Sequence, residues 1–169
     1  MTLSPPNEKR SALLVGASGL IGRHCLEYLL AEDLYESVTV LVRKTLPLTH
    51  PKLVQYSIDF DRMEQSSDLI HANDVYCCLG TTLKKAGSQE AFRKVDFDYP
   101  RQLATIAAQN GVQQFLLITA LGANSQSRIF YNRVKGEVEE AIVPLSFFGI
   151  SFFRPSLLIG QREEVRRGE

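Results

Sequence analysis

The chain has 169 residues, of which 44% are hydrophobic and 22% are charged, as is typical of one soluble globular domain. Nineteen basic residues balance nineteen acidic ones, so the chain lacks the excess of positive charge that attracts nucleic acid or an anionic membrane. The longest apolar runs, 115–120 and 141–153, are too short or too interrupted to span a bilayer. We therefore expect neither a nucleic acid nor a membrane as a partner.

Residues 1–10 carry two prolines and polar side chains where a secretion signal would need an apolar core. We interpret 1–10 as a flexible lead-in and 11–169 as one domain, and we predict a cytoplasmic protein. The three cysteines, Cys25, Cys77 and Cys78, fit neither a disulfide framework nor the spacing of a zinc site. We interpret them as reduced, buried thiols, and no metal site is expected.

Apolar and β-branched runs alternate with amphipathic segments along the chain. The runs that predict strands are 11–15, 37–42, 53–58, 74–79, 114–119 and 149–153. The segments that predict helices are 21–31, a short one near 63–71, a long one at 88–110, and 128–143. Such alternation favours right-handed βαβ units. The predicted fold is α/β, a doubly wound, mostly parallel Rossmann sheet of about six strands with helices on both faces.

A glycine-rich turn joins the first predicted strand to the first predicted helix. It consists of Gly16, Ala17, Ser18, Gly19, Leu20, Ile21 and Gly22. The first glycine permits a sharp exit from the strand, the second lets the backbone approach a pyrophosphate, and the third allows close packing of helix and strand. The helix N-terminus then offers unpaired N–H groups to the phosphates. Three glycines alone are a weak signal for a dinucleotide, so the rest of the chain has to support it.

The second predicted strand ends at Arg43 and Lys44, twenty-one residues past Gly22. An NAD site would place an acidic residue there to bind the ribose hydroxyls. A guanidinium instead matches a phosphate in a forked geometry, so this pair favours NADP(H) over NAD(H). Solvated surface charges at a strand end are the alternative.

Two further strand ends reach the same predicted edge of the sheet, where open α/β sheets bind ligands. The third strand runs into Asp59 and Phe60, and the Asp59 carboxylate could accept a hydrogen bond from an adenine amino group; a helix cap or turn is its alternative role. The fourth strand delivers Leu79, Gly80, Thr81 and Thr82, which would lie against the ribose and phosphates. A plain loop at this position stays open.

Tyr131 and Lys135 are four residues apart in the last predicted helix and therefore lie on one face of it. The ammonium can lower the pKa of the phenol and hold a ribose hydroxyl, while the phenol acts as a general acid toward a carbonyl that receives hydride. Thr119, at the end of the fifth strand, is the candidate for orienting the substrate oxygen. Its alternative role is that of a β-branched residue completing a strand.

Six sequence motifs of the chain resemble those of the atypical branch of the short-chain dehydrogenase/reductase superfamily, in particular the Tat-interacting, metastasis-suppressor oxidoreductase family and its bacterial homologues. These motifs lie at 16–22, 77–82, 85–87, 95–99, 131–139 and 153–156. The resemblance implies a Rossmann fold, NADPH binding through the glycine turn and Arg43, and Tyr131 with Lys135 in the catalytic position. We also assign Lys135, Arg154 and Pro155 to the cofactor site.

The chain departs from this family pattern in two places. Thr119-Ala120 stands where many members carry a serine pair, and the chain ends at Glu169 where members continue with a further strand and helices. We therefore expect a fragment, or a protein that lacks most of the substrate pocket. One hypothesis is an NADP(H)-dependent oxidoreductase acting on a small carbonyl or alcohol. The other is a non-catalytic NADPH-binding module with a regulatory protein partner; a homodimer also stays open.

Overall fold

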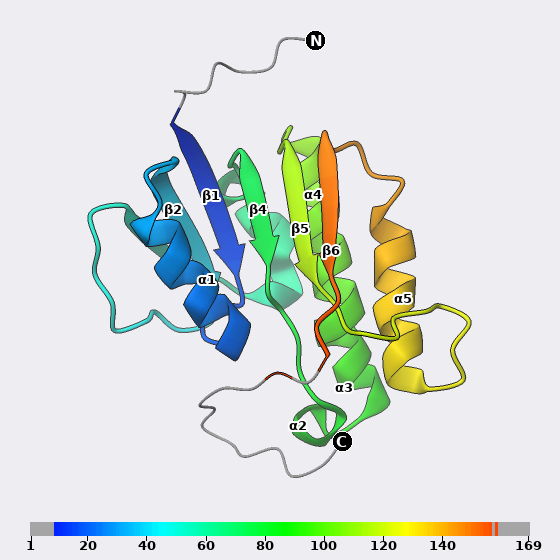
Figure 1. Cartoon of the computed structure of the whole chain (residues 1–169). Coiled ribbons are helices and arrows are strands. Elements are labelled where there is room, and N and C mark those ends of the chain that lie inside the picture. The colour runs from blue at the N-terminus through cyan, green and yellow to red at the C-terminus, as the bar shows by residue number, and fades with distance from the viewer. Residues whose placement is uncertain (1–8, 157, 159–169) are drawn as a thin grey trace.

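The computed structural model of the chain describes residues 9–156 and 158. Its centre is a parallel sheet with the strand order β3-β2-β1-β4-β5-β6 (Figure 1). The strands are β1 (Arg10–Val15), β2 (Tyr35–Val42), β3 (Leu53–Ser57), β4 (Asp74–Cys77), β5 (Gln114–Ile118) and β6 (Gly149–Phe153). Every pairing between neighbours is parallel. The order reverses between β1 and β4, which is where doubly wound sheets form a crevice for ligands.

Helices cover both faces of the sheet. They are α1 (Leu20–Ala31), a 3-10 segment (Phe60–Leu69), α2 (Leu83–Ala86), α3 (Gln89–Arg93), a π-helical turn (Lys94–Asp98), α4 (Tyr99–Gln109) and α5 (Phe130–Ile142). In Figure 1, α1 lies in front of β1 and β2, α4 lies behind β5 and β6, and α5 lies to the right of β6. Buried residues of α4 and α5 belong to one core cluster, and those of α1 belong to the other. The predicted α/β Rossmann architecture with helices on both faces is confirmed.

The first strand is buried on both of its faces, which explains its continuous apolar sequence. Leu13 and Val15 belong to the core shared with α4 and α5, whereas Ala12 and Leu14 belong to the core beneath α1. These four residues are at most 1% exposed. β1 therefore anchors both layers and holds the turn that follows it in a fixed place.

Most boundaries differ from the sequence predictions by one or two residues, and three segments differ in kind or extent. β4 ends at Cys77 rather than at residue 79, and the short helix α2 follows with Thr82 as its cap. The predicted helix at 88–110 begins with Ser88 capping α3 but widens into the π-helical turn before α4. The predicted helix near 63–71 is a 3-10 segment that starts earlier, because the Asp59 side chain accepts a hydrogen bond from Asp61 N at 2.9 Å.

Candidate dinucleotide and catalytic site

The glycine turn has no space for side chains at two of its three glycines. Gly16 has a φ of +89°, and a Cβ there would lie 2.5 Å from the Cys78 carbonyl oxygen. A Cβ on Gly22 would lie 2.1 Å from the Gly16 oxygen. Gly19 is exposed and begins α1 without a side-chain cap. The turn thus packs backbone against backbone and presents a helix N-terminus at its surface, an arrangement that fits a pyrophosphate.

The other residues of the turn divide between core and surface. Ala17 is 2% exposed and packs beneath α1, whereas Ser18 is exposed and Leu20 and Ile21 are half-buried. The Gly19 N–H donates to the Gly16 oxygen at 3.0 Å, which closes the turn. Ser18 and Gly19 are therefore the most accessible residues of the turn.

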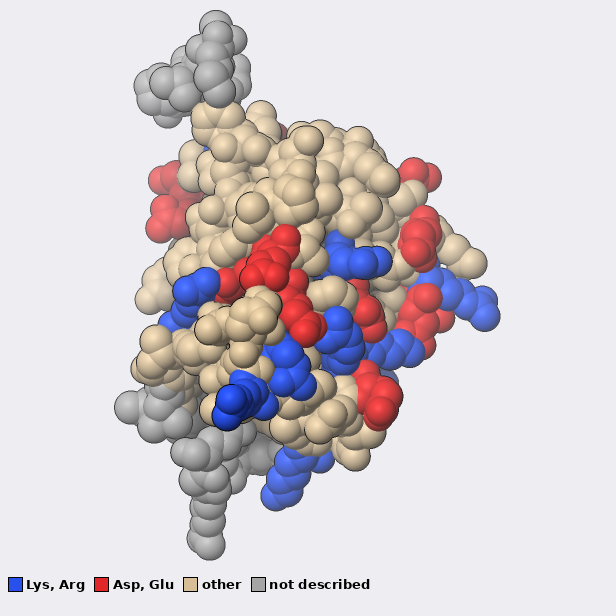
Figure 2. Space-filling view, turned by 90° about the vertical axis from the view of Figure 1, so that its right-hand side faces the viewer, with Lys and Arg blue, Asp and Glu red and all other residues tan. Residues whose placement is uncertain are grey.

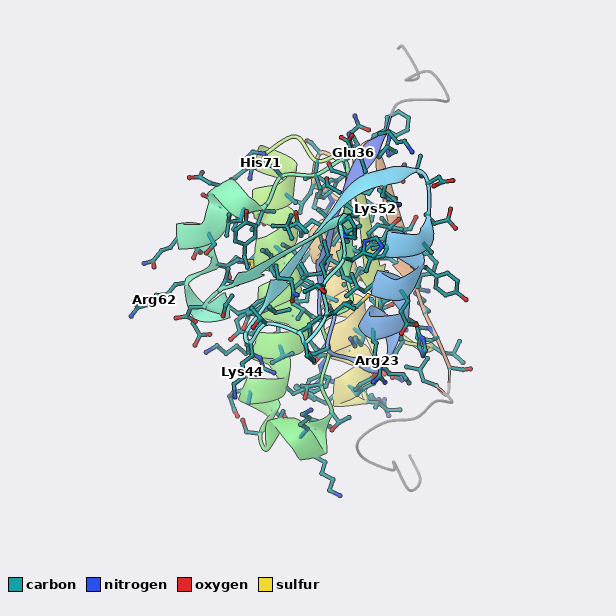
Figure 3. All side chains as sticks on the ribbon, turned by 90° about the vertical axis from the view of Figure 1, so that its left-hand side faces the viewer. Arg23, Glu36, Lys44, Lys52, Arg62 and His71 are labelled. Carbon is teal, nitrogen blue, oxygen red and sulfur yellow. The ribbon has the colours of Figure 1, made fainter. Side chains whose placement is uncertain are left out.

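Arg43 and Lys44 follow β2 at the carboxyl edge of the sheet, and both are exposed. The Arg43 carbonyl oxygen accepts a hydrogen bond from the Ser57 hydroxyl at 3.0 Å, which ties this backbone to the end of β3. Figure 3 shows Lys44 and Arg23, from the start of α1, toward the same lower end of the molecule, and Lys52 nearer the opposite end. Cations from two elements thus lie at the edge that carries the glycine turn.

Asp59 and Phe60 stand where the sequence places them, just past β3, but with different environments. Phe60 is 6% exposed, and its ring packs against Tyr99 at 5.6 Å between centroids. Asp59 is exposed and caps the 3-10 segment. Asp59 therefore has the helix-capping role in this structure, and its contact with an adenine stays a prediction.

A buried ion pair joins α5 to the helical segment after β4. Lys135 Nζ lies 2.7 Å from Asp96 Oδ1, and the two residues are 5% and 1% exposed. Asp96 Oδ2 accepts a hydrogen bond from Thr81 N at 2.8 Å. A Cβ on Gly80 would lie 3.4 Å from Asp96 Oδ1 and 3.7 Å from Lys135 Nζ. The pair therefore fixes the loop after β4, and only backbone lies over the ammonium at Gly80.

Asp96 is a residue of this site that the sequence analysis missed. It lies in the π-helical turn Lys94–Asp98, a conformation that often occurs at functional positions. The only sequence signal for Asp96 is its place in the family motif at 95–99. Its contact with Lys135 joins two helical segments and therefore leaves no local sequence pattern. Leu79, on the same loop, packs half-buried against the larger core. Thr82 caps α2 by accepting from Lys85 N at 3.0 Å.

Tyr131 is half-buried one turn before Lys135 on α5. Its ring packs against Phe92 of α3 at 5.5 Å between centroids, and the Phe130 ring lies 5.7 Å from Phe92. This aromatic contact restricts the orientation of the phenol. Tyr131 and Lys135 share one face of the helix, and the ammonium is held at the base of that face by Asp96.

Thr119 and Arg154 meet at a different carboxylate. The Thr119 hydroxyl donates to Glu139 Oε1 at 2.6 Å, and Arg154 pairs with the same carboxylate through two guanidinium nitrogens. Thr119 and Glu139 are 4% and 5% exposed, and Arg154 is exposed. The Pro155 oxygen accepts from Leu121 N at 2.8 Å. The structure therefore links Thr119 and Arg154 to each other through Glu139, and the Thr119 proton is engaged there.

Gly136 sets the position of the loop between β5 and α5. A Cβ there would lie 2.1 Å from Ser125 N and 2.3 Å from the carbonyl carbon of Asn124.

Figure 2 shows basic and acidic side chains interspersed over the lower half of the face beside α5. Glu137 pairs with Arg93 and, at 3.9 Å, with Arg133. This surface is thus a mixture of both signs rather than a basic patch.

Within residues 9–156 and 158, no group of three or more His, Cys, Asp or Glu side chains is arranged to hold a metal ion. None of the helices in the same part of the chain combines the length and apolarity that crossing a bilayer requires.

Residues 16–143 match the family model described as NAD(P)H-binding. The chain therefore belongs to the NAD(P)H-binding family, and its fold is that of the Rossmann-type short-chain dehydrogenase/reductase proteins.

Its curated relatives include Protein HTATIP2 of Rattus norvegicus, 36% identical over 166 residues that cover 96% of this chain and 68% of that protein. They also include the mitochondrial Protein FMP52 of Candida albicans, 31% identical over 159 residues that cover 91% of this chain and 69% of that protein. The family resemblance inferred from the sequence is thereby confirmed. The name of the yeast relative does not test the predicted cytoplasmic location, which stays a prediction.

Solved structures show the same fold at low sequence identity. WbmG of Bordetella bronchiseptica in complex with NAD superposes with a TM-score of 0.71 at 14% identity and covers 90% of this chain and 55% of that one. MoeE5 in complex with UDP-glucose and NAD has a TM-score of 0.71 at 15% identity, with 85% and 53% covered. This chain thus spans about half the length of these structures.

Proposed function

We propose that this protein is an NADP(H)-dependent oxidoreductase that transfers hydride between NADPH and a small carbonyl or alcohol. The observation that carries the proposal is the buried pair of Lys135 with Asp96, which places an ammonium one turn from Tyr131 on the helix face beside the loop after β4. An unpaired buried ammonium is costly, so Asp96 allows this charge to exist at the site.

Each group of site residues has its own role in the proposed reaction. The glycine turn binds the pyrophosphate through backbone N–H groups, and Lys135 orients a ribose hydroxyl. NADPH supplies the hydride. Tyr131 donates its phenolic proton to the carbonyl oxygen, or accepts a proton from an alcohol in the reverse direction. Thr119 is the least supported of the three catalytic candidates, because its hydroxyl proton is engaged by Glu139.

Replacing Tyr131 tests the reaction. The Tyr131→Phe variant should lose about 10²- to 10⁴-fold in kcat with small aldehydes and ketones while NADPH affinity stays nearly unchanged. NADPH absorbance measures turnover, and nucleotide fluorescence measures binding. Tyr56→Phe is the matched control, because Tyr56 is 40% exposed on β3. Unchanged turnover in Tyr131→Phe would refute the assignment.

Cofactor preference is tested at the end of β2. If Arg43 and Lys44 bind a 2′-phosphate, NADPH should bind more tightly than NADH, and Arg43→Ala should reduce that difference by about 1.5–3 kcal/mol, the worth of a hydrogen bond to a charged group. Lys52→Ala removes a positive charge from the strand-start side of the sheet and should leave the difference intact. The Lys52 ammonium donates to the Glu32 backbone oxygen at 2.8 Å. Equal affinities of the unmodified protein for both nucleotides would refute the preference.

A non-catalytic NADPH-binding module with a regulatory partner is the second candidate function. The engagement of the Thr119 hydroxyl by Glu139 favours it, because that hydroxyl cannot donate to a substrate at the same time. Oxidation of NADPH with a defined carbonyl at ordinary enzymatic rates, about 1 s⁻¹ or faster, would exclude this candidate. NADPH binding without turnover on any carbonyl would favour it.

A further inference from the structure

A hollow of about 190 Å³ lies between α1 and the sheet, and none of Tyr131, Lys135 and Thr119 lines it. Its lining comes from α1, from β4 and the residue after it, and from β5 and β6. The lining residues are Ile21, Cys25, Tyr76, Cys78, Leu116, Ile118 and Phe153. Two of the three cysteines of the chain therefore face one apolar space, although they are fifty-three positions apart in the sequence.

The two thiols have the same surroundings. Cys25 and Cys78 line the same hollow, and both side chains are partly buried against the core beneath α1. Cys77 belongs to the core on the opposite face of the sheet and is 0% exposed. Adjacent cysteines thus have separate environments, because successive side chains of a strand point to opposite faces.

We propose that Cys25 and Cys78 are a redox site, in which a hydroperoxide oxidises the two thiols to a reversible intramolecular disulfide. Cys25 also lines a second, more open hollow of about 340 Å³ with Leu20, Ile21, His24, Tyr28 and Leu158. A small hydroperoxide therefore has a path to Cys25 from solvent.

The oxidation balances in two steps. The Cys25 thiolate attacks one peroxide oxygen, the O–O bond breaks, and the alcohol or water leaves with a proton, which gives a sulfenic acid on Cys25. The Cys78 sulfur then attacks that sulfur, the S–O bond breaks, and water leaves as the S–S bond forms. Each thiol loses one electron and one proton, and the peroxide takes up two electrons and two protons.

The environment assigns the two roles. The hydrogen bond from Cys78 lowers the pKa of Cys25, which favours the attacking thiolate there. The same contact, together with burial, raises the pKa of Cys78, so this sulfur suits the resolving step. Burial raises the pKa of Cys77 to about 12, which keeps that thiol protonated and unreactive.

A disulfide between Cys25 and Cys78 would connect α1 with the end of β4, and both of these elements adjoin the glycine turn. A disulfide is about 2.05 Å long, shorter than any contact between two unbonded sulfur atoms, so closing the bridge would draw α1 and the end of β4 toward each other. Gly16 already packs with no space for a Cβ against the Cys78 carbonyl, and Gly22 packs in the same way against Gly16. The movement should therefore distort the turn and weaken dinucleotide binding, a consequence that rests on the proposed function.

Peptide mapping tests the bridge itself. The purified full chain is treated with hydrogen peroxide, its free thiols are alkylated, and it is digested with trypsin. We expect a linked species lighter than its two parent peptides by two hydrogens, which dithiothreitol reverses. Cys77 and Cys78 share one tryptic peptide, so fragment spectra must locate the bond at Cys78. A sulfinic acid on Cys25 without a bridge, a bond through Cys77, or a bond between two copies would overturn the proposal.

Variants separate the bridge from nucleotide binding. Cys25→Ser should abolish the linked species, whereas Cys77→Ala should retain it, and circular dichroism checks that both are folded. For the unmodified protein, oxidation should raise the Kd for NADPH about fivefold or more, and reduction should restore it. Cys25→Ser should bind NADPH equally with and without peroxide. A mapped bridge that leaves the Kd unchanged would refute the coupling but not the redox site, and reduced protein that binds no NADPH would refute the proposed function alone.

Discussion

The two edges of the sheet hold buried charge in different ways. At the amino edge, Asp74 accepts hydrogen bonds from the Arg10 guanidinium at 2.9 and 2.6 Å and from the Tyr35 hydroxyl at 2.8 Å, and Tyr35 meets the Tyr76 hydroxyl at 2.7 Å. At the carboxyl edge, Lys135 and Asp96 pair beneath Gly80. The side chains of Arg10 and Tyr35 contact the Asp74 carboxylate, whereas the backbone of Gly80 lies over the Lys135 ammonium.

This difference separates structural from functional polar groups on one sheet. The amino-edge network joins the starts of β1, β2 and β4, so its bonds stabilise the register of three strands. The carboxyl-edge pair joins a loop to α5 at the predicted cofactor site. Variants at the amino edge should therefore change stability alone, whereas variants at the carboxyl edge should change stability and nucleotide binding together.

The largest effect is expected for Asp96→Ala. It leaves the Lys135 ammonium in a site where the lysine side chain is 6% exposed, and breaking a buried pair costs about 3–5 kcal/mol. Urea unfolding at neutral pH measures this loss, and NADPH affinity measured on the folded protein should fall as well. Asp98→Ala is the matched control, because Asp98 is an exposed acid in the same π-helical turn. Equal losses in the two variants would contradict the assigned role of the pair.

Asp74→Ala should have the next largest effect. The substitution leaves the Tyr35 phenol and a partly buried guanidinium without their shared acceptor, and we expect a loss of about 2–3 kcal/mol in the free energy of unfolding. The loss is smaller than for Asp96 because Arg10 retains access to water, with 20% of its side chain exposed. Isothermal titration should give an unchanged NADPH affinity. A weakened affinity would break the distinction between the two edges.

Sequence patterns predicted the parts of this molecule that depend on neighbours along the chain. The alternation of apolar runs identified the six strands, and the glycine spacing identified the turn at 16–22. The pairing of Lys135 with Asp96 and that of Thr119 with Glu139 could not be predicted, because each joins residues of different elements through the tertiary fold. The four-residue helix α2 is likewise too short to leave a periodic pattern.

Thr119→Val tests whether this residue belongs with the catalytic groups or with the structural ones. The near-isosteric change removes the hydroxyl that donates to the buried Glu139 carboxylate, and we expect a loss of about 1–2 kcal/mol, since Arg154 still pairs with that carboxylate. Thr119→Ser should restore stability. If turnover on a carbonyl substrate falls in the valine variant and recovers in the serine variant well beyond the change in stability, the hydroxyl also serves the reaction.

The smallest effect is expected for Tyr35→Phe, and its pH dependence distinguishes the amino-edge network. Burial, followed by the hydrogen bonds to Tyr76 and Asp74, raises the pKa of Tyr35 above its ordinary value of 10.0. Below pH 10 the phenol is protonated in both states, and its stabilisation is fully present. Above pH 10 the unfolded chain releases the proton while the folded protein retains it, so stability falls as pH rises.

The phenylalanine variant lacks this titration. At pH 8 it should be less stable than the unmodified protein by about 1 kcal/mol, because it loses the hydroxyl's hydrogen bonds. Between pH 10 and 11 the deficit should narrow, since only the unmodified protein loses the contribution of Tyr35 over that range. Urea unfolding at several pH values measures the difference, and Tyr56→Phe on exposed β3 provides the control. A deficit that stays constant through pH 11 would show that the Tyr35 phenol is not held protonated by the network around Asp74.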